Sequence, residues 1–487
     1  MLISIVVFAL NILMVRAVAL ACPGCTGWQA TLFQGLAGII FLALSHGFGQ
    51  GVQWKPHSRS NLYGQSSDFQ NQPTRGITST NKLMTTSEKT QQYLLQTYGR
   101  FPLTIVRGSG SKVWDDRGRE YLDFCAGIAT CSIGHCHPAL SKAVADQTQT
   151  LMHCSNLYAG DKQADLAELL VEGIIGEPGK VFFSNSGAEA NDGLIKLARR
   201  FGAESDRHEI ITFNKGFHGR TIGAMSATAQ GKIHEGFGPL FPGFVYSDFN
   251  DLVAAKAAIT DKTAAFLVEP IQGEGGVNVA TKEFLEGLAA LAKEHKLLLL
   301  LDEVQTGFGR TGEINGWEAI APDIQPDAVS WAKGMGGGFP IGGFWVSDQH
   351  APLLGPGSHG STYGGNALAC AASLAVVQTI ISENLIENVK KRETQIRETI
   401  AAWNHPAITG VNGHGLLLGA KLDESKLSIP EGKVPSIYLT IALIEAGSLH
   451  APAGPDVVRL IPPLNVTAEE VDQMLELFKS VLDKHLK

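Results

Sequence analysis

Two polar side chains with complementary chemistry each follow a run of apolar residues. Asp302 comes directly after five leucines that begin at Leu297, and Lys333 follows the largely apolar run Ala328–Ala332. Apolar runs of this length are typical of strands that are buried on both faces of a parallel sheet. Open α/β sheets place their ligand sites where such strands end. The carboxylate and the amine are therefore expected to meet at one edge of a sheet.

An amine and a carboxylate on neighbouring strands suit the cofactor pyridoxal 5′-phosphate. Lys333 would bind the cofactor aldehyde as a Schiff base, and Asp302 would hydrogen-bond the ring nitrogen and keep it protonated. A free lysine has a pKa of about 10.4, and burial in a cationic site should lower that pKa, so Lys333 could serve as the catalytic base. The alternative is that both residues simply end buried strands.

A third block of residues predicts a binding site for a phosphate. Ser186, Gly187 and Ala188 follow a short apolar run and precede a helical pattern. Serine is a preferred N-cap, and the small residues after it leave the first N–H groups of the helix uncovered. A helix N-terminus of this kind binds anions. In isolation the block could also be an ordinary capped helix.

Six blocks in order along the chain resemble the signature of the class III aminotransferases. The likeness extends from about Tyr98 to the C-terminus. It implies an α/β fold, the type I fold of pyridoxal-phosphate-dependent transferases, with a large, mostly parallel sheet domain and a smaller α+β domain. The blocks are Phe183–Asn191, Phe217–Thr221, Val268–Gly276, Asp302–Gly312, Lys333 and Gly360–Asn366.

The same resemblance implies further contacts with the cofactor. Phe217 corresponds to the aromatic residue that stacks on the pyridine ring, and Gln305 to the residue that touches the phenolic oxygen. Thr362 corresponds to a threonine whose hydroxyl reaches the phosphate from the neighbouring subunit, so a homodimer with active sites shared across its interface is implied. The remaining members of the expected cofactor set are His218, Glu303 and Val304.

Within the family, the chain is most similar to the acetylornithine aminotransferases. Ile128 stands where ornithine aminotransferases carry a tyrosine that contacts a free α-amino group, and an apolar residue suits an acylated amine. Residues 236–240 and 155–158 are also similar, whereas Ala159 and Gly160 depart from the common pattern. The resemblance implies transfer of the δ-amino group of N2-acetyl-L-ornithine to 2-oxoglutarate. The products would be N-acetylglutamate 5-semialdehyde and glutamate, as in arginine biosynthesis.

Four residues are expected to bind the substrates. Arg459 resembles the arginine that takes the α-carboxylate of glutamate or 2-oxoglutarate, and Glu274 the glutamate that pairs with it and can swing away. Arg220 resembles the arginine that holds the acetylornithine carboxylate, and Ser361 completes the set. The planar guanidinium suits carboxylates and keeps its charge. For each arginine, a surface position is the alternative.

Other functions remain open at this point. Ornithine, succinylornithine and 4-aminobutyrate aminotransferases share the motifs, and a pyridoxal-phosphate aminomutase or decarboxylase would not need 2-oxoglutarate. A non-catalytic dimeric scaffold is the remote alternative. The net charge of −8 gives no indication of a nucleic-acid partner. The spacing of Cys131, His135, Cys136 and His137 fits no zinc pattern, so no metal is expected.

The chain of 487 residues is long enough for several domains. Residues 84–150 are predicted to be the N-terminal part of a small domain that starts with a hairpin at 112–124. Residues 151–362 are predicted to form the large cofactor-binding domain, and residues 363–487 the C-terminal small domain. The expected strands include 181–183, 209–213, 265–268, 297–301, 328–332, 415–419 and 457–460.

The segment 1–83 is expected to be a non-catalytic, largely disordered extension. It contains two apolar stretches, lacks Asp and Glu before Asp68, and is then rich in Ser, Gln, Asn and Gly. If Met84 is the true start, the protein is cytoplasmic; an organellar targeting segment would instead place it in a plastid or the mitochondrial matrix. A signal or membrane anchor is the third interpretation. Neither stretch reaches the roughly 18–20 residues of a membrane span, so no membrane is expected for the catalytic part.

Overall fold

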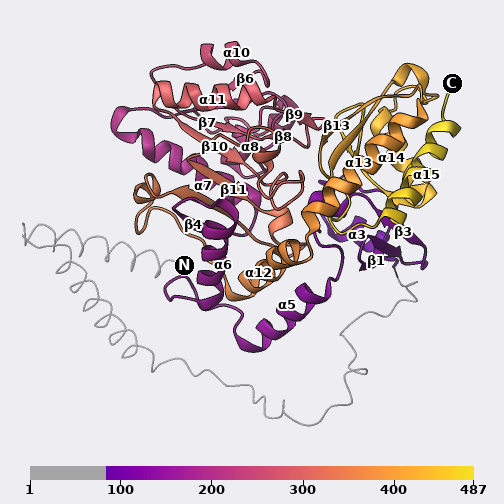
Figure 1. Cartoon of the computed structure of the whole chain (residues 1–487), viewed down its shortest axis with the longest axis horizontal. Coiled ribbons are helices and arrows are strands. Elements are labelled where there is room, and N and C mark those ends of the chain that lie inside the picture. The colour runs from indigo at the N-terminus through magenta and orange to yellow at the C-terminus, as the bar shows by residue number, and fades with distance from the viewer. Residues whose placement is uncertain (1–83) are drawn as a thin grey trace, which may run out of the picture. The chain divides into compact units, whose positions relative to one another are not determined.

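The leucine run that ends at Asp302 is a central strand of the largest sheet in the computed structural model, which describes residues 84–487 (Figure 1). This strand, β10 (Leu298–Asp302), runs parallel to β11 (Ala328–Trp331) and to β7 (Thr263–Val268). The full order is β4-β12-β11-β10-β7-β5-β6, and only β12 is antiparallel to its neighbours. The other bounds are β4 Gly179–Ser184, β5 Glu209–Phe213, β6 Phe244–Ser247 and β12 Gly342–Ser347. The predicted large, mostly parallel sheet is confirmed.

Both faces of this sheet are covered, which explains why the leucine run does not alternate with polar residues. Leu298 and Leu300 pack with the helix α7 (Gly187–Gly202) on one face. Leu299 and Leu301 point to the opposite face and belong to the core that includes α11 (Lys282–His295). Figure 1 shows α10 and α11 along the upper side of these strands. The result is a three-layer α/β arrangement with Asp302 at the carboxyl edge of its central strand.

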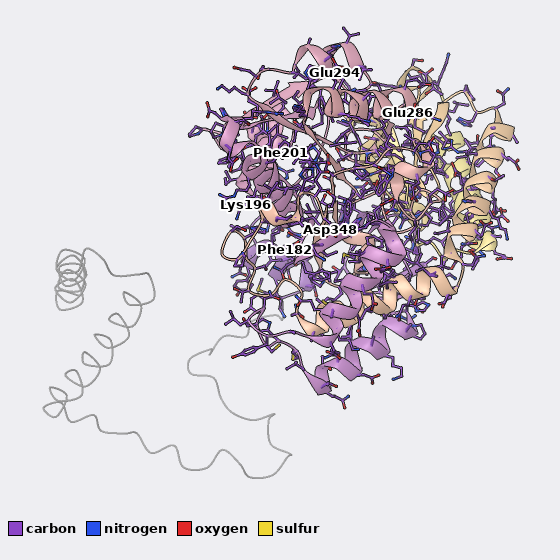
Figure 2. The ribbon with its side chains drawn as sticks, turned by 60° about the vertical axis from the view of Figure 1, so that its left-hand side comes forward. Phe182, Lys196, Phe201, Glu286, Glu294 and Asp348 are labelled. Carbon is purple, nitrogen blue, oxygen red and sulfur yellow. The ribbon has the colours of Figure 1, made fainter. Side chains whose placement is uncertain are left out.

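Helix ends follow from local capping. Thr281 caps α11, because its hydroxyl accepts the N–H of Phe284, and α11 ends at Lys296 in the left-handed region. Glu286 and Glu294 lie along α11 at the top of Figure 2; Glu294 is exposed to solvent and Glu286 is half-buried. The other helices are α3 Thr86–Tyr93, α5 Pro138–Thr150, α6 Asp161–Glu168, α8 Ile222–Ala227, α9 Gly231–His234, α10 Leu252–Ala257, α12 Ala367–Ser382, α13 Leu385–Trp403, α14 Pro435–Ala446 and α15 Ala468–Lys484.

Two smaller sheets contain the first and last parts of the described chain. The expected hairpin is present as β2 (Lys112–Asp115) and β3 (Glu120–Asp123), and β15 (Ser448–Leu449) extends that sheet in parallel to β3. Figure 1 accordingly shows the indigo N-terminal strands beside the yellow C-terminal helices. The remaining strands are β1 Ile105–Ser109, β8 Ile271–Gln272, β9 Asn278–Val279, β13 Ile408–His414, β14 Leu417–Leu422, β16 Ala451–Ala453 and β17 Val457–Leu460.

One expected strand was placed wrongly. The prediction started a strand at Gly415, whereas Gly415 has a φ of +58° and lies in the turn between β13 and β14. The positive φ is a conformation that glycine adopts without steric cost, so the chain reverses there and the strand begins at Leu417.

Some predictions concern features that the structure does not decide. The segment 1–83, with its apolar stretches, lies outside the described residues. Residues 84–487 form one compact unit, so the proposed domain limits at 150 and 362 stay predictions. Within this unit no single helix has the length and apolarity of a membrane span, although the bent pair α12 and α13 passes on length and composition together. No group of three or more metal-binding side chains occurs among these residues.

Candidate active site

Asp302 and Lys333 lie at the same edge of the sheet. Asp302 ends β10 directly opposite Ser330 of the parallel strand β11, and Lys333 follows the end of β11. Lys333 has a φ of +42°, a left-handed conformation that is uncommon for an L-residue and that tends to occur at functional sites. Burial lowers the pKa of the Lys333 amine. The edge therefore presents an amine that loses its proton more readily than an exposed lysine.

The carboxylate of Asp302 is fixed by three contacts and is only 3 % exposed. Its Oδ2 lies 2.8 Å from Nδ1 of His218 and accepts a 2.7 Å hydrogen bond from the Asn191 side chain. Its Oδ1 accepts the N–H of Val304 at 3.0 Å. Asn191 also accepts a 2.6 Å hydrogen bond from Ser330, so it ties α7 to two neighbouring strands. Asn191 was not among the predicted site residues, although it closes the first motif block and its buried amide requires a partner.

The predicted phosphate site lies at the start of α7. The Ser186 hydroxyl accepts the N–H of Glu189 at 3.3 Å, as an N-cap does. The N–H groups of Gly187 and Ala188 are in the first turn and have no partner within the helix. A Cβ on Gly187 would lie only 2.7 Å from Cγ1 of Val304, two residues after Asp302. The close approach brings the helix N-terminus against the Asp302 loop.

The loop after β5 carries the predicted stacking residue. Phe217 donates its N–H to Oε2 of Glu269 at 2.9 Å. The guanidinium carbon of Arg220 lies 5.7 Å from the centre of the Phe217 ring, and the Arg220 side chain is exposed. Glu269 is buried, and burial together with the nearby Asp302 charge raises its pKa well above the usual range. Glu269 was not among the predicted site residues either, because only the fold brings it to the N–H of Phe217.

A buried ion pair joins the large sheet region to the C-terminal strands. Arg459 binds Glu274 through two hydrogen bonds, from Nη1 to Oε1 at 2.6 Å and from Nη2 to Oε2 at 3.1 Å. The side-chain amide of Gln305 donates to Glu274 Oε1 at 3.2 Å. Burial alone would raise the pKa of Glu274, but the Arg459 charge and hydrogen bonds lower it to about 2. The predicted pairing of Arg459 with Glu274 is therefore present beside Gln305.

Three predicted site residues are not brought into this group within one chain. Both carboxylate oxygens of Glu303 accept backbone N–H groups, from Gly316 at 2.7 Å and Trp317 at 3.0 Å. The Ser361 hydroxyl accepts the side-chain amide of Asn185 at 3.2 Å, next to the α7 N-cap. Thr362 is exposed and lines a shallow cavity with residues that include Leu151 and Tyr158.

The donor set fits pyridoxal 5′-phosphate. A buried amine, a fixed carboxylate, an aromatic ring and a helix N-terminus with free N–H groups provide partners for the aldehyde, the ring nitrogen, the ring face and the phosphate. The paired Arg459 adds a buried cation that suits a substrate carboxylate.

Comparisons with known proteins agree with this chemistry. The profile of the class-III aminotransferases matches residues 93–482. An acetylornithine aminotransferase from Caldanaerobacter subterraneus subsp. tengcongensis is 44 % identical over 406 residues, which is 82 % of this chain and 99 % of that protein. Its counterpart from Thermosynechococcus vestitus is 46 % identical over 397 residues, or 79 % and 93 % of the two chains.

Solved structures of aminotransferases are also similar to this chain. The ornithine aminotransferase of Toxoplasma gondii superposes with a TM-score of 0.76 at 33 % identity and covers 82 % of this chain and 96 % of its own. The acetylornithine aminotransferase of Elizabethkingia anophelis superposes with a TM-score of 0.71 at 30 % identity, over 82 % and 98 % of the two chains. The chain belongs to the class-III aminotransferases, which depend on pyridoxal 5′-phosphate.

Proposed function

We propose that this enzyme transfers the δ-amino group of N2-acetyl-L-ornithine to 2-oxoglutarate and thereby serves arginine biosynthesis. The observation that carries the proposal is the buried Arg459–Glu274 pair beside Gln305, in the same site as Lys333 and Asp302. The same site must accept, in turn, a substrate with one carboxylate and a substrate with two carboxylates. A cation that a mobile carboxylate can cover or expose meets both requirements.

The proposed roles of the residues follow from their contacts. When bound, pyridoxal phosphate supplies a ring that accepts the electrons of the broken substrate C–H bond. Asp302, fixed by His218 and Asn191, keeps the ring nitrogen protonated. Lys333, whose pKa is lowered by burial, would take the proton from the substrate carbon that bears the amine and would then give it back within the site, first as a base and then as an acid.

Substrate binding is assigned to the two arginines. Arg220 is exposed and lies over the Phe217 ring, so its guanidinium is free to hold the α-carboxylate of acetylornithine. Arg459 is covered by Glu274 in this state. We propose that Glu274 swings away when 2-oxoglutarate binds, because a dicarboxylate competes for the same guanidinium. Ser361 is assigned to the substrate side of the site.

We also propose a homodimer in which Thr362 completes the site of the partner subunit. Thr362 is exposed in a single chain, so its hydroxyl is available to another molecule. Large apolar side chains are exposed near it in sequence and around the cavity that it lines: Leu151, Met152, Leu157, Tyr158 and Tyr363. An exposed apolar patch of this kind on an otherwise well packed unit is typical of an interaction surface.

The test is an absorbance titration of the full chain supplied with pyridoxal phosphate. The lysine-bound cofactor absorbs in the near-visible range. We expect that band to disappear on addition of N2-acetyl-L-ornithine and to return with 2-oxoglutarate. If the band instead disappears only with ornithine or 4-aminobutyrate, that compound is the substrate and acetylornithine is not. A protein that never forms the band with cofactor in excess would contradict the assigned role of Lys333.

A further inference from the structure

Four consecutive residues in front of the site have left-handed backbone conformations. The φ angles of Ala126, Gly127, Ile128 and Ala129 are 47°, 62°, 62° and 59°, over the segment labelled α4 (Ala126–Ala129). Glycine adopts such angles freely, but the three residues with a Cβ do not. A left-handed turn of this length persists only where the surrounding structure holds it.

One buried carboxylate holds the start of the turn. Oδ1 of Asp123 accepts the N–H of Cys125 at 3.0 Å and that of Ala126 at 2.8 Å. Oδ2 of Asp123 lies 2.7 Å from Nε2 of His135. The backbone of His135 is itself fixed, because its N–H and C=O both pair with Gly110 in the β1–β2 turn. Asp123 therefore links the left-handed turn to a rigid hairpin.

The His135 side chain acts as the counter-ion of Asp123. The hydrogen bond that the ring donates to Asp123, helped by Cys131, raises the pKa of His135 to about 10, so the ring is a cation at neutral pH. A buried carboxylate without this partner would carry an uncompensated charge. The end of the turn is closed by Thr130, whose hydroxyl donates to the carbonyl of Gly127 at 2.8 Å.

The turn presents a single side chain outward. Ala126 and Ala129 are buried, whereas Ile128 is 38 % exposed. Ala129 belongs to a small apolar cluster whose other members include Val277, close to Glu274, and Val457 and Ile461, on either side of Arg459. Through Ala129 the turn is therefore anchored against the two segments that carry the ion pair, and the preceding residue, Ile128, keeps an exposed side chain.

We propose that Asp123 and His135 are positioning residues that set the place of Ile128, and that they thereby select an acylated over a free α-amino group in the substrate. The inference deepens the proposed function and rests on it for the identity of the substrate. An apolar side chain discriminates against a charged amine only if it is held where that amine would lie. The left-handed turn provides that constraint, and the Asp123–His135 pair maintains the turn.

The test compares His135→Ala with His135→Gln and with a matched control. Glutamine keeps a donor for Asp123 but no charge, and alanine removes both. Asp115→Asn is the control, because Asp115 is a buried carboxylate of the same hairpin that accepts N–H groups of Arg117 and Arg119 and does not touch the turn. The measurements are kcat and KM for acetylornithine and for ornithine, and amide hydrogen exchange of residues 125–131.

For His135→Ala we expect KM for acetylornithine to rise about tenfold, with kcat within about twofold of the wild type, so the preference over ornithine falls about tenfold. Amides 128–131 should exchange at least about tenfold faster. His135→Gln should recover most of both effects, and Asp115→Asn should show neither. Unchanged exchange and unchanged preference in His135→Ala would overturn the inference, as would equal changes in Asp115→Asn.

The exchange measurement also separates this inference from the proposed function. If the wild type does not act on acetylornithine, the proposed substrate is wrong. In that case, amides 128–131 that exchange faster in His135→Ala but not in Asp115→Asn would still support the positioning role. Unchanged exchange in His135→Ala would overturn it.

Discussion

Lys333 and its neighbours form a buried site in which charges of both signs are balanced. Burial lowers the pKa of Lys333, and the carboxylates of Glu274, Asp302 and Glu269 oppose that effect while Arg459 reinforces it. The lowered pKa makes the neutral amine, the form that can take a proton, more accessible than in an exposed lysine. This balance depends on single side chains, so point substitutions test it directly.

The first prediction concerns Lys333→Ala. We expect the near-visible band of the lysine-bound cofactor to be absent and kcat to fall on the order of 100- to 10,000-fold, because the base is removed. Lys180→Ala is the control, since Lys180 lies on β4 with a side chain that is 76 % exposed. Absorbance and steady-state kinetics measure both effects. Turnover near the wild-type rate in Lys333→Ala would be incompatible with the mechanism.

The second prediction concerns Arg459→Lys. A lysine cannot replace the two parallel hydrogen bonds that Arg459 makes with Glu274, or those proposed for 2-oxoglutarate. We expect KM for 2-oxoglutarate to rise about 10- to 100-fold, while the reaction with acetylornithine in a single half-turnover changes little. Arg200→Lys, on the exposed end of α7, is the matched control. An equal loss in both half-reactions would show that Arg459 is not specific to 2-oxoglutarate.

At the scale of elements, close packing brings separate segments to one point. The N-terminus of α7 meets the Asp302 loop through Gly187 and Val304, and the turn at 126–129 is anchored between strands. In that turn three residues other than glycine adopt left-handed angles, each at a cost of about 1–2 kcal/mol. Such elements cannot be moved without changing the site that they support.

The third prediction concerns Gly187→Ala. The added Cβ would lie 2.7 Å from Val304, so either the helix or the loop must shift, at a cost of about 1–3 kcal/mol. We expect the cofactor dissociation constant to rise about tenfold, as measured by quenching of protein fluorescence. Val304→Ala in the same chain should restore much of the affinity, because it removes the clashing methyl groups. Gly231→Ala, where a Cβ meets no atom within 4 Å, should have no effect.

For the whole molecule, electrostatics couples the site to the pH dependence of folding. The pKa of His135 is raised from 6.5 to about 10, mainly by its hydrogen bond to Asp123, so its stabilising contribution is complete below pH 6.5 and is lost as the pH rises through about 10. The nearby Cys131 thiol is the other titratable group that faces this ring.

The fourth prediction follows from the raised pKa of His135. In urea unfolding, the difference in free energy of unfolding between the wild type and His135→Gln should be largest near pH 6 and should shrink towards pH 10. The reason is that the histidine at position 135 loses its charge over this pH range, whereas a glutamine there has no charge to lose. Asp115→Asn should differ from the wild type by an amount that does not change between these pH values. A difference that grows with pH would contradict the ion pair.

The fifth prediction tests the proposed dimer. If Thr362 serves the partner subunit, a hybrid of Lys333→Ala and Thr362→Ala chains contains one site with both changes and one intact site. Mixed and reassociated subunits should therefore be more active than the two parent proteins together. If Thr362 acts in its own chain, every site in the hybrid carries one defect and mixing restores nothing. Subunit exchange is verified by size and by mass.

Much of this structure follows from local signals in the sequence. Runs of mainly apolar residues predicted β4, β5, β7, β10 and β11, because strands buried on both faces need mostly apolar residues. The same signals placed Asp302 and Lys333 at strand ends and Ser186 at a helix start. Their predicted roles toward the cofactor stay predictions, but the fold does bring them to one edge.

Contacts between distant segments decided the rest. The strand β12 begins with two glycines that weaken its signal, and only its pairing with β4 and β11 defines it. Asn191 finds its partner on β10, Glu269 finds its partner in the loop after β5, and Glu303 turns its carboxylate toward Gly316. The sequence alone determined which segments are strands and helices and which residue types stand at their ends, because burial and capping act over a few residues. Only the tertiary structure decided which polar groups meet and that the chain from Ala126 to Ala129 turns left-handed, because those arrangements depend on hydrogen bonds and packing between residues far apart in the chain.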